Sequence, residues 1–103
     1  MNDLMRPALY GANHKIMPVK KNRKVSKKSY EFVGPICEST DKFLDVNKFQ
    51  KLNEKDFIAI CDTGAYGMSL SSNYNMRPKA PEIFINGSKI KIITKRQKLK
   101  DLI

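Results

Sequence analysis

The dipeptide Asn86-Gly87 is the feature that most constrains the fold of this chain. It separates two apolar stretches, EIFI at 82–85 and SKIKII at 88–93. Asparagine and glycine both tolerate the positive φ that a type I′ turn requires, and this turn joins neighbouring antiparallel strands. The segment therefore predicts a β-hairpin.

Three further segments have the composition of strands. They are HKIMPVK at 14–20, VSKKSYEFV at 25–33 and FIAIC at 57–61. Gly34-Pro35 ends the second segment, because proline has no amide to donate to a β-ladder. The third is a short continuous apolar run, which is typical of a strand buried on both faces.

The segments between these strands carry other signals. Residues 37–49 are expected to form a loop with one turn of helix, and residues 62–78, rich in glycine and small polar residues, a short helix or tight coil. About five strands with local hairpins indicate a mainly β fold, an antiparallel sheet or partly open β-barrel with one or two short helices. No repeat or linker divides the chain, so residues 1–103 are interpreted as a single small domain.

The net charge of +10 raises the question of a nucleic-acid partner. The basic residues concentrate at 20–28 and 89–100, where lysine outnumbers arginine and no aromatic residues are interleaved for base stacking. A solvated loop and a solvated strand face explain the charge at least as well. A nucleic-acid partner is thus not expected, although a basic, nucleic-acid-binding β-barrel is kept as an alternative.

The chain lacks the signals of membrane insertion or export. It has no apolar run of about 18 residues, which a membrane-spanning helix needs. Its first residues, MNDLMRPALYGA, lack a basic region followed by a long apolar stretch. We expect a protein of the cytoplasm without a membrane partner.

The cysteines and the single histidine point to no metal site. Two cysteines, far apart in sequence, do not form a zinc-binding pattern. Cys61 ends an apolar run and is predicted to be a small buried residue, whereas Cys37 lies in a loop beside Glu38. His14 is expected at the surface or at an interface. Without a second imidazole, neither a histidine-rich metal site nor a self-contained Cys-His catalytic pair is expected.

Three motifs occur in a characteristic order, RPALYGA at 6–12, GPICES at 34–39 and DTGAYGMSLSSNYNMRP at 62–78. Together they resemble the C-terminal β-domain of the diaminopimelate decarboxylase family, pyridoxal-phosphate enzymes related to alanine racemase and ornithine decarboxylase. The resemblance extends from Leu4 to about Leu102. It implies an alanine racemase C-terminal domain-like fold. It also implies a fragment of an enzyme that decarboxylates meso-2,6-diaminopimelate to L-lysine in lysine biosynthesis.

The resemblance also implies roles for five side chains. Arg6 and Tyr10 would hold the distal carboxylate of the substrate, and Glu38 would recognise its distal ammonium group. Cys37 would protonate or shield the carbanion left when CO2 departs, and both Cys37 and Glu38 would reach across a dimer interface. Tyr66 would lie beside the cofactor and its phosphate. The serines of 69–72, together with Asn75, are assigned packing, turn or interface duties.

The family's cofactor lysine and glycine-rich phosphate loop belong to an N-terminal TIM-like barrel that these residues do not include. The resemblance therefore implies a partner, either a separate barrel domain or a homodimer, and no activity from this chain alone. A nonfunctional remnant of a truncated gene is a further alternative. Without the barrel, the sheet is expected to keep an unpaired edge and an exposed apolar face.

Overall fold

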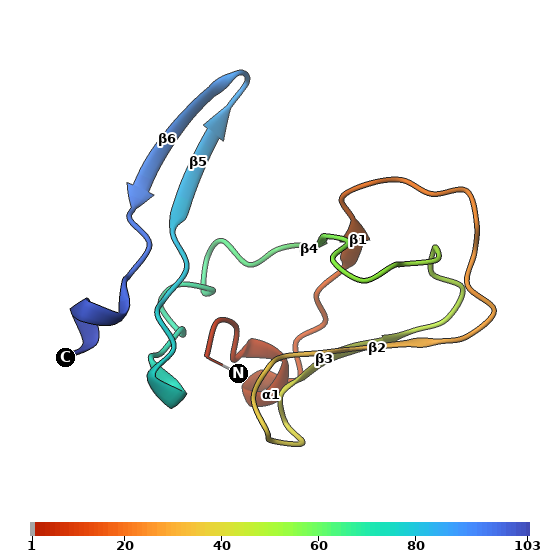
Figure 1. The fold of residues 1–103 in the computed structure, drawn as a ribbon, viewed down its shortest axis with the longest axis horizontal. Helices are drawn as coiled ribbons and strands as arrows, with labels where there is room; N and C mark the ends of the chain where they lie inside the picture. Colours follow the sequence, from red (N-terminus) through yellow and green to blue (C-terminus); the bar gives the residue numbers. More distant parts are fainter. Residues whose placement is uncertain (1) are drawn as a thin grey trace.

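The computed structural model describes residues 2–103, and within them the fold is mainly β (Figure 1). Six strands form three antiparallel pairs: β1 (Ile16–Pro18) with β4 (Ile58–Ile60), β2 (Tyr30–Val33) with β3 (Lys42–Val46), and β5 (Glu82–Asn86) with β6 (Lys89–Thr94). Three short helical segments complete the elements: α1 (Arg6–Tyr10) and the 3-10 turns η1 (Tyr74–Met76) and η2 (Leu99–Leu102). The predicted mainly β, antiparallel fold with short helices is confirmed. Over this range the three sheets do not close into a barrel.

Strand β3 lies in the segment predicted to be loop, and that prediction was wrong. Its apolar residues Leu44 and Val46 lie on either side of Asp45 and pair with Phe32 and Tyr30 of β2. Such cross-strand pairs between aromatic and aliphatic side chains stabilise an antiparallel sheet. The short alternation is hard to see within a charged segment, and the pairing partner, distant in sequence, decides its structure.

Three other strands, β1, β2 and β4, are shorter than predicted. Residues 14–20 yield only the three residues of β1, and Val25 makes a single bridge to Gln50 outside the regular strand β2. The expectation that residues 57–61 are buried on both faces was also wrong. Ile58 and Ile60 are half-buried while Ala59 between them is exposed, because only one face of this two-stranded sheet is covered.

The predicted hairpin is confirmed, but its two turn residues are Gly87 and Ser88 instead of Asn86 and Gly87. Asn86 lies at the end of β5 without a positive φ, so the predicted type I′ turn was wrong. Asn86 pairs with Lys89, and Gly87 has a φ of 60°, a value that glycine adopts without strain. The register shifts between Glu82 and Ile83, which marks a β-bulge near the open end of the hairpin. Figure 1 shows this hairpin, coloured blue, projecting away from the other two sheets.

The core is a cluster formed by Ile16, Phe32 and Phe49, with Tyr30 packed against it. The rings of Phe32 and Phe49 meet edge to face with centroids 5.2 Å apart, and Tyr30 meets Phe49 in the same way at 6.1 Å. The Tyr30 hydroxyl accepts a hydrogen bond of 3.0 Å from the backbone amide of Leu52. That bond, aided by Ser26, lowers the pKa of Tyr30 from its usual value.

His14 is buried, contrary to the prediction of a surface or interface position. Its side chain is 3% exposed, and Nδ1 donates a hydrogen bond of 2.8 Å to the carbonyl oxygen of Cys61. The pairing of β1 with β4 explains this burial, since the Cys61 amide donates to Lys15, the neighbour of His14. Cys61 itself is half-buried rather than fully buried. No helix among the described residues is long and apolar enough to cross a membrane.

Candidate functional site

The first motif forms helix α1, which the sequence patterns did not indicate. Pro7 lies in its first turn, where the missing amide costs nothing, and Gly11 ends it at a φ of 61° while donating to the Pro7 carbonyl (3.1 Å). The helix holds Arg6 half-buried and leaves Tyr10 67% exposed. Both residues predicted to bind the distal carboxylate of the substrate therefore lie on one short, defined element.

The second motif forms a loop that Asp41 holds in place. The buried carboxylate of Asp41 accepts a hydrogen bond of 2.7 Å from the Ile36 amide, and its carbonyl accepts one of 2.8 Å from the Gly34 amide. A Cβ at Gly34 would collide with this carboxylate, so only glycine fits there. With Ile36 buried, the loop presents Cys37 and Glu38 to solvent.

The third motif forms a tight coil with the 3-10 turn η1 near its end. Of the two predicted alternatives for residues 62–78, a short helix or a tight coil, the structure shows the coil. The Gly67 amide donates to the Thr63 carbonyl (2.7 Å), and the Leu70 amide donates to the Tyr66 carbonyl (3.0 Å). A side chain at Gly67 would clash with the Thr63 carbonyl. The glycine is thus required by the turn, which leaves the ring of Tyr66 53% exposed.

The fold brings the first and third motifs together. The guanidinium carbon of Arg6 lies over the ring of Tyr66, 4.9 Å from its centroid, a cation–π geometry. Just ahead of α1, the carbonyl of Asn2 accepts a hydrogen bond of 2.7 Å from the Ser72 amide. These contacts connect two segments that are 60 to 70 residues apart in the sequence.

The second motif also meets the third, through a residue that sequence reasoning missed. The hydroxyl of Tyr74 donates a short hydrogen bond to the carboxylate of Glu38. This bond raises the pKa of Tyr74, because the phenolic proton is needed for it, and the nearby Cys37 adds to the effect. The only available signal for Tyr74 was its place within the third motif, which was interpreted as packing and turn residues.

The five predicted residues thus fall into separate groups. Arg6 contacts Tyr66, and Cys37 and Glu38 share the loop that Tyr74 contacts. Tyr10 stands apart, with no hydrogen bond from its hydroxyl to any residue in 2–103. Across the same range, no three His, Cys, Asp or Glu side chains are grouped so that they could hold a metal ion.

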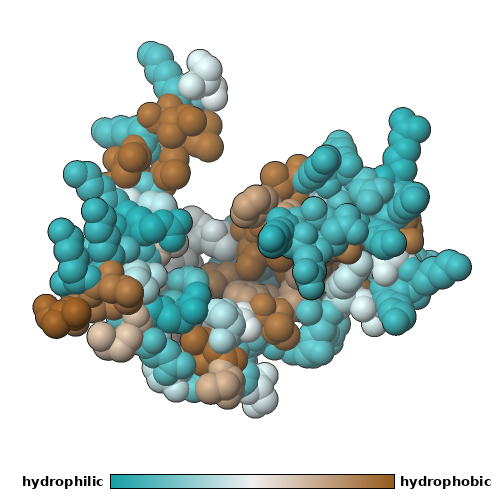
Figure 2. Space-filling model, viewed as in Figure 1, coloured by the Kyte–Doolittle hydropathy of each residue, from teal (hydrophilic) through white to brown (hydrophobic). Residues whose placement is uncertain are grey.

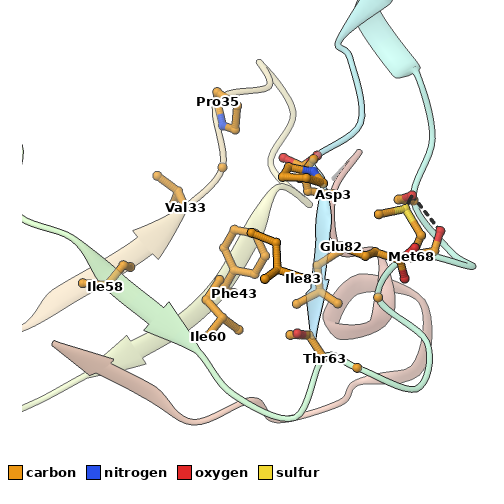
Figure 3. Close-up of a pocket in the computed structure, with 17 residues that line it drawn as sticks. Asp3, Val33, Pro35, Phe43, Ile58, Ile60, Thr63, Met68, Glu82 and Ile83 are labelled. Atoms are coloured by element: carbon orange, nitrogen blue, oxygen red, sulfur yellow. Dashed lines mark hydrogen bonds between the residues drawn. The ribbon is translucent and has the colours of Figure 1, made fainter. Parts of the chain in front are cut away.

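An open cavity of about 650 Å³ lies beside these groups (Figure 3). Its walls are mainly apolar and come from β2, β3, β4 and the start of β5: Val33, Phe43, Ile58, Ile60 and Ile83. Met68, from the third motif, contributes to its rim. None of the five predicted site residues is among the residues that line it.

The fold defines the class first: a small domain of open antiparallel sheets with an uncovered, mainly apolar cavity. The sequence pattern of one such family, described as "Pyridoxal-dependent decarboxylase, C-terminal sheet domain", matches residues 1–64. The chain belongs to this family.

Similar sequences extend over nearly the whole chain. A diaminopimelate decarboxylase of Vibrio cholerae is 42% identical over 102 residues, covering 99% of this chain and 24% of the relative. One from Helicobacter pylori is 45% identical over 104 residues, covering 99% of this chain and 25% of the relative. The chain therefore spans about a quarter of the length of these curated relatives, and the predicted resemblance is confirmed.

Solved structures agree with the sequence comparisons. A crystal structure of a Helicobacter pylori diaminopimelate decarboxylase variant complexed with L-lysine is 44% identical, with a TM-score of 0.88 over 99% of this chain and 25% of that one. The diaminopimelate decarboxylase from M. jannaschii in co-complex with L-lysine is 35% identical, with a TM-score of 0.90 over 99% and 23% of the two chains.

Proposed function

We propose that this chain supplies the substrate-binding sheet domain of a pyridoxal-phosphate-dependent diaminopimelate decarboxylase, which converts meso-2,6-diaminopimelate to L-lysine and CO2. The observation that carries the proposal is the meeting of all three motifs, with Arg6 on Tyr66 and Glu38 on Tyr74. The relatives named diaminopimelate decarboxylase support the substrate, and the lysine complexes support the product.

The proposed roles of the charged residues follow from the chemistry of the substrate. Its distal end carries a carboxylate and an ammonium group, which call for a cation and an anion. Arg6 offers a planar guanidinium that binds a carboxylate through two parallel hydrogen bonds, with the exposed phenol of Tyr10 as a further donor. Glu38 offers the anion, and the hydrogen bond from the Tyr74 hydroxyl holds its carboxylate in one orientation.

The cofactor would lie against Tyr66. The ring is half exposed and its hydroxyl forms no hydrogen bond to any residue in 2–103, so this hydroxyl can donate one to a phosphate. When bound, pyridoxal phosphate supplies the electron-accepting ring that decarboxylation of an amino acid needs. Cys37, exposed at the tip of its loop, is proposed to hold or deliver a proton at the carbon that loses CO2.

The rest of the site is proposed to come from a partner. The open apolar cavity and the exposed β5–β6 hairpin are surfaces that a second polypeptide would cover, either a separate barrel domain or another subunit in a dimer. The relatives' additional length, about three quarters of each, is consistent with this division. The proposed setting of the activity is the cytoplasm.

The test is complementation. The 103-residue chain is mixed with a relative's barrel from which the sheet domain has been deleted, and release of CO2 from meso-2,6-diaminopimelate is measured. We expect activity well above that of the barrel alone. Cys37→Ala should remove most turnover, whereas Arg6→Ala should mainly raise KM. Arg96→Ala, which changes an exposed arginine outside the motifs, is the matched control and should leave both constants unchanged. No gain over the barrel alone would contradict the proposal.

A further inference from the structure

A strongly basic surface lies on the side of the molecule away from the β5–β6 hairpin. It consists of residues 20–28 and 48–56, which run antiparallel side by side and are called the basic arm below. The Ser26 amide donates to the Phe49 carbonyl, and the Lys51 amide donates to the Lys24 carbonyl, both at 2.8 Å. Figure 1 shows this arm as the orange and yellow-green loops at the right of the view.

The basic arm carries most of the chain's excess charge. It holds nine lysines and arginines against two carboxylates, a net charge of +7 out of the chain's +10: Lys20, Lys21, Arg23, Lys24, Lys27, Lys28, Lys48, Lys51 and Lys55, with Glu54 and Asp56. Within residues 2–103, none of these nine cations forms an ion pair. Figure 2 shows hydrophilic side chains gathered over this end of the molecule. Such uncompensated charge creates a field that attracts polyanions.

The basic arm is held by hydrogen bonds and is not a loose charged segment. The Asn22 amide donates to the side-chain oxygen of Gln50 (2.9 Å), and the Gln50 side-chain amide donates to the Lys20 carbonyl (2.8 Å). The Lys24 amide donates to the side chain of Asn22 (3.0 Å). These bonds fix the backbone of 20–24 around a hollow of about 400 Å³. Arg23 and its neighbouring lysines are among the residues that line this hollow.

An aromatic side chain stands at the end of the basic arm. The Val19 amide donates to the Phe57 carbonyl (3.0 Å), which extends the β1–β4 pairing and places Phe57 beside Val19 and Lys20. Phe57 is 79% exposed, more than any other aromatic residue that the structure describes, and Val19 is 65% exposed. The sequence argued against a nucleic-acid partner because no aromatic lies within the basic stretches. The fold places Phe57, which follows residues 48–56 directly, beside the start of the distant stretch 20–28.

We propose that the basic arm binds single-stranded nucleic acid, with its lysines and Arg23 on the phosphates and Phe57 stacked on a base. Proteins that bind single strands combine a positively charged track with exposed aromatic rings in this way. Lysine-rich contacts are directed at the backbone, so binding is expected without base specificity. This site shares no residue with the motifs of the proposed decarboxylase site and does not depend on that proposal.

Binding is measured with the full chain and a fluorescently labelled oligothymidylate, by anisotropy over a series of salt concentrations. If the arm neutralises about five phosphates, the logarithm of the binding constant should fall with a slope of about −3.5 against the logarithm of salt concentration. Absence of binding at low salt would overturn the proposal. Preferential binding to vesicles of anionic lipid, with no binding to the oligonucleotide, would overturn it in favour of a membrane surface.

Two variants locate the site. Lys21→Glu combined with Arg23→Glu should weaken binding by at least about tenfold. The matched control is Lys89→Glu combined with Lys91→Glu, which changes the net charge equally on β6 and should alter affinity by less than about twofold. Equal losses of affinity in the two double variants would show that binding depends on net charge alone, and would overturn the assignment of binding to the basic arm.

The stacking contribution is tested separately. Phe57→Ala should weaken oligothymidylate binding about tenfold while leaving the affinity for inorganic polyphosphate, which has no bases, unchanged. An unchanged affinity for both ligands would overturn the role of Phe57 and with it the assignment to nucleic acid. Circular dichroism spectra identical to the parent chain establish that each variant is folded.

Discussion

The four strands β1 to β4 and the hairpin β5–β6 are built from similar residues but differ in what covers them. The first two sheets cover the cluster of Ile16, Phe32 and Phe49, and each has one protected face. In the hairpin, every residue from Ile83 to Thr94 is exposed. A two-stranded hairpin is marginal in water by itself. The difference indicates that the folding stability of this chain comes mainly from the two sheets β1–β4 and β2–β3. The hairpin instead exposes a surface that a binding partner could cover.

The register of the hairpin sorts its exposed residues onto two faces. Ile83 pairs with Ile92 and Ile85 with Ile90, so four isoleucines share one face. On the other face, Phe84 pairs with Lys91. Covering a branched aliphatic side chain of this size is worth about 1.5–3 kcal/mol. When a partner docks, covering the isoleucine face would therefore contribute more binding free energy than covering the other face.

The largest expected effect separates the two regions by their contribution to folding. Phe32→Ala should lower the free energy of unfolding by about 3–5 kcal/mol, because it leaves a cavity in the aromatic cluster. Phe84→Ala, the same change in the hairpin, should alter it by less than about 0.5 kcal/mol. Urea unfolding followed by circular dichroism measures both. Similar losses in the two variants would show that the hairpin packs in solution.

The loop of the second motif should depend on one buried carboxylate. Asp41→Ala removes the acceptor for the Ile36 amide and should cost about 1–3 kcal/mol in urea unfolding. Hydrogen exchange of the Ile36 amide should accelerate in the same variant. Asp41→Asn keeps a side-chain oxygen and should recover part of the loss. If Asp41→Ala leaves both measurements unchanged, another group holds the loop that carries Cys37 and Glu38.

The hairpin should govern association rather than stability. Ile85→Lys interrupts the isoleucine face and should reduce self-association of the chain and its binding of an apolar dye, with unfolding changed by less than about 0.5 kcal/mol. Ser88→Lys adds the same charge at the turn and serves as the control. Sedimentation and dye fluorescence measure these effects. Equal behaviour of the two variants would exclude the isoleucine face as the associating surface.

A smaller effect distinguishes two tyrosines by their titration. The Leu52 amide lowers the pKa of Tyr30 below the usual 10.0, whereas the bond to Glu38 raises that of Tyr74 above it. The Tyr74 contribution to folding is therefore present below its unfolded-state pKa and lost as the pH rises through the folded-state value. The Tyr30 contribution is present above its unfolded-state pKa and lost as the pH falls through the folded-state value.

Ultraviolet absorbance of the phenolate follows these titrations. Tyr74→Phe should remove a titration step that occurs above the usual tyrosine pKa, and Tyr30→Phe should remove one that occurs below it. Glu38→Gln should move the pKa of Tyr74 downward, because the charged acceptor is lost. A Tyr74 step that Glu38→Gln does not move would refute the contact between the second and third motifs.

The smallest effect is expected from the ion pairs on the surface of β2–β3. Lys42 lies 2.9 Å from Asp45 and 3.1 Å from Glu31, and these carboxylates raise its pKa, Asp45 more than Glu31. All three side chains are exposed, so water and salt screen them. Lys42→Met should lower the urea midpoint slightly at low salt and not at high salt. A loss that persists in high salt would point to packing of the lysine stem.

Local patterns predicted some parts of the molecule well. The hairpin depends on the positive φ that Gly87 adopts without strain, and Gly34-Pro35 ended a strand because proline lacks an amide. The strand β3 was missed because its stability comes from pairing with Phe32 and Tyr30. The burial of His14 was missed because its partner, Cys61, is 47 residues away in sequence.

The sequence by itself determined the antiparallel β class, the family and the residues that carry its motifs, since turn preferences and motif order are properties of neighbouring residues. Only the tertiary structure decided which residues meet: Arg6 with Tyr66, Glu38 with Tyr74, and Phe57 with Val19. Contacts between distant segments depend on strand register and packing. A one-residue change of register turns each side chain to the other face, so the pairing of distant strands decides which residues are buried together.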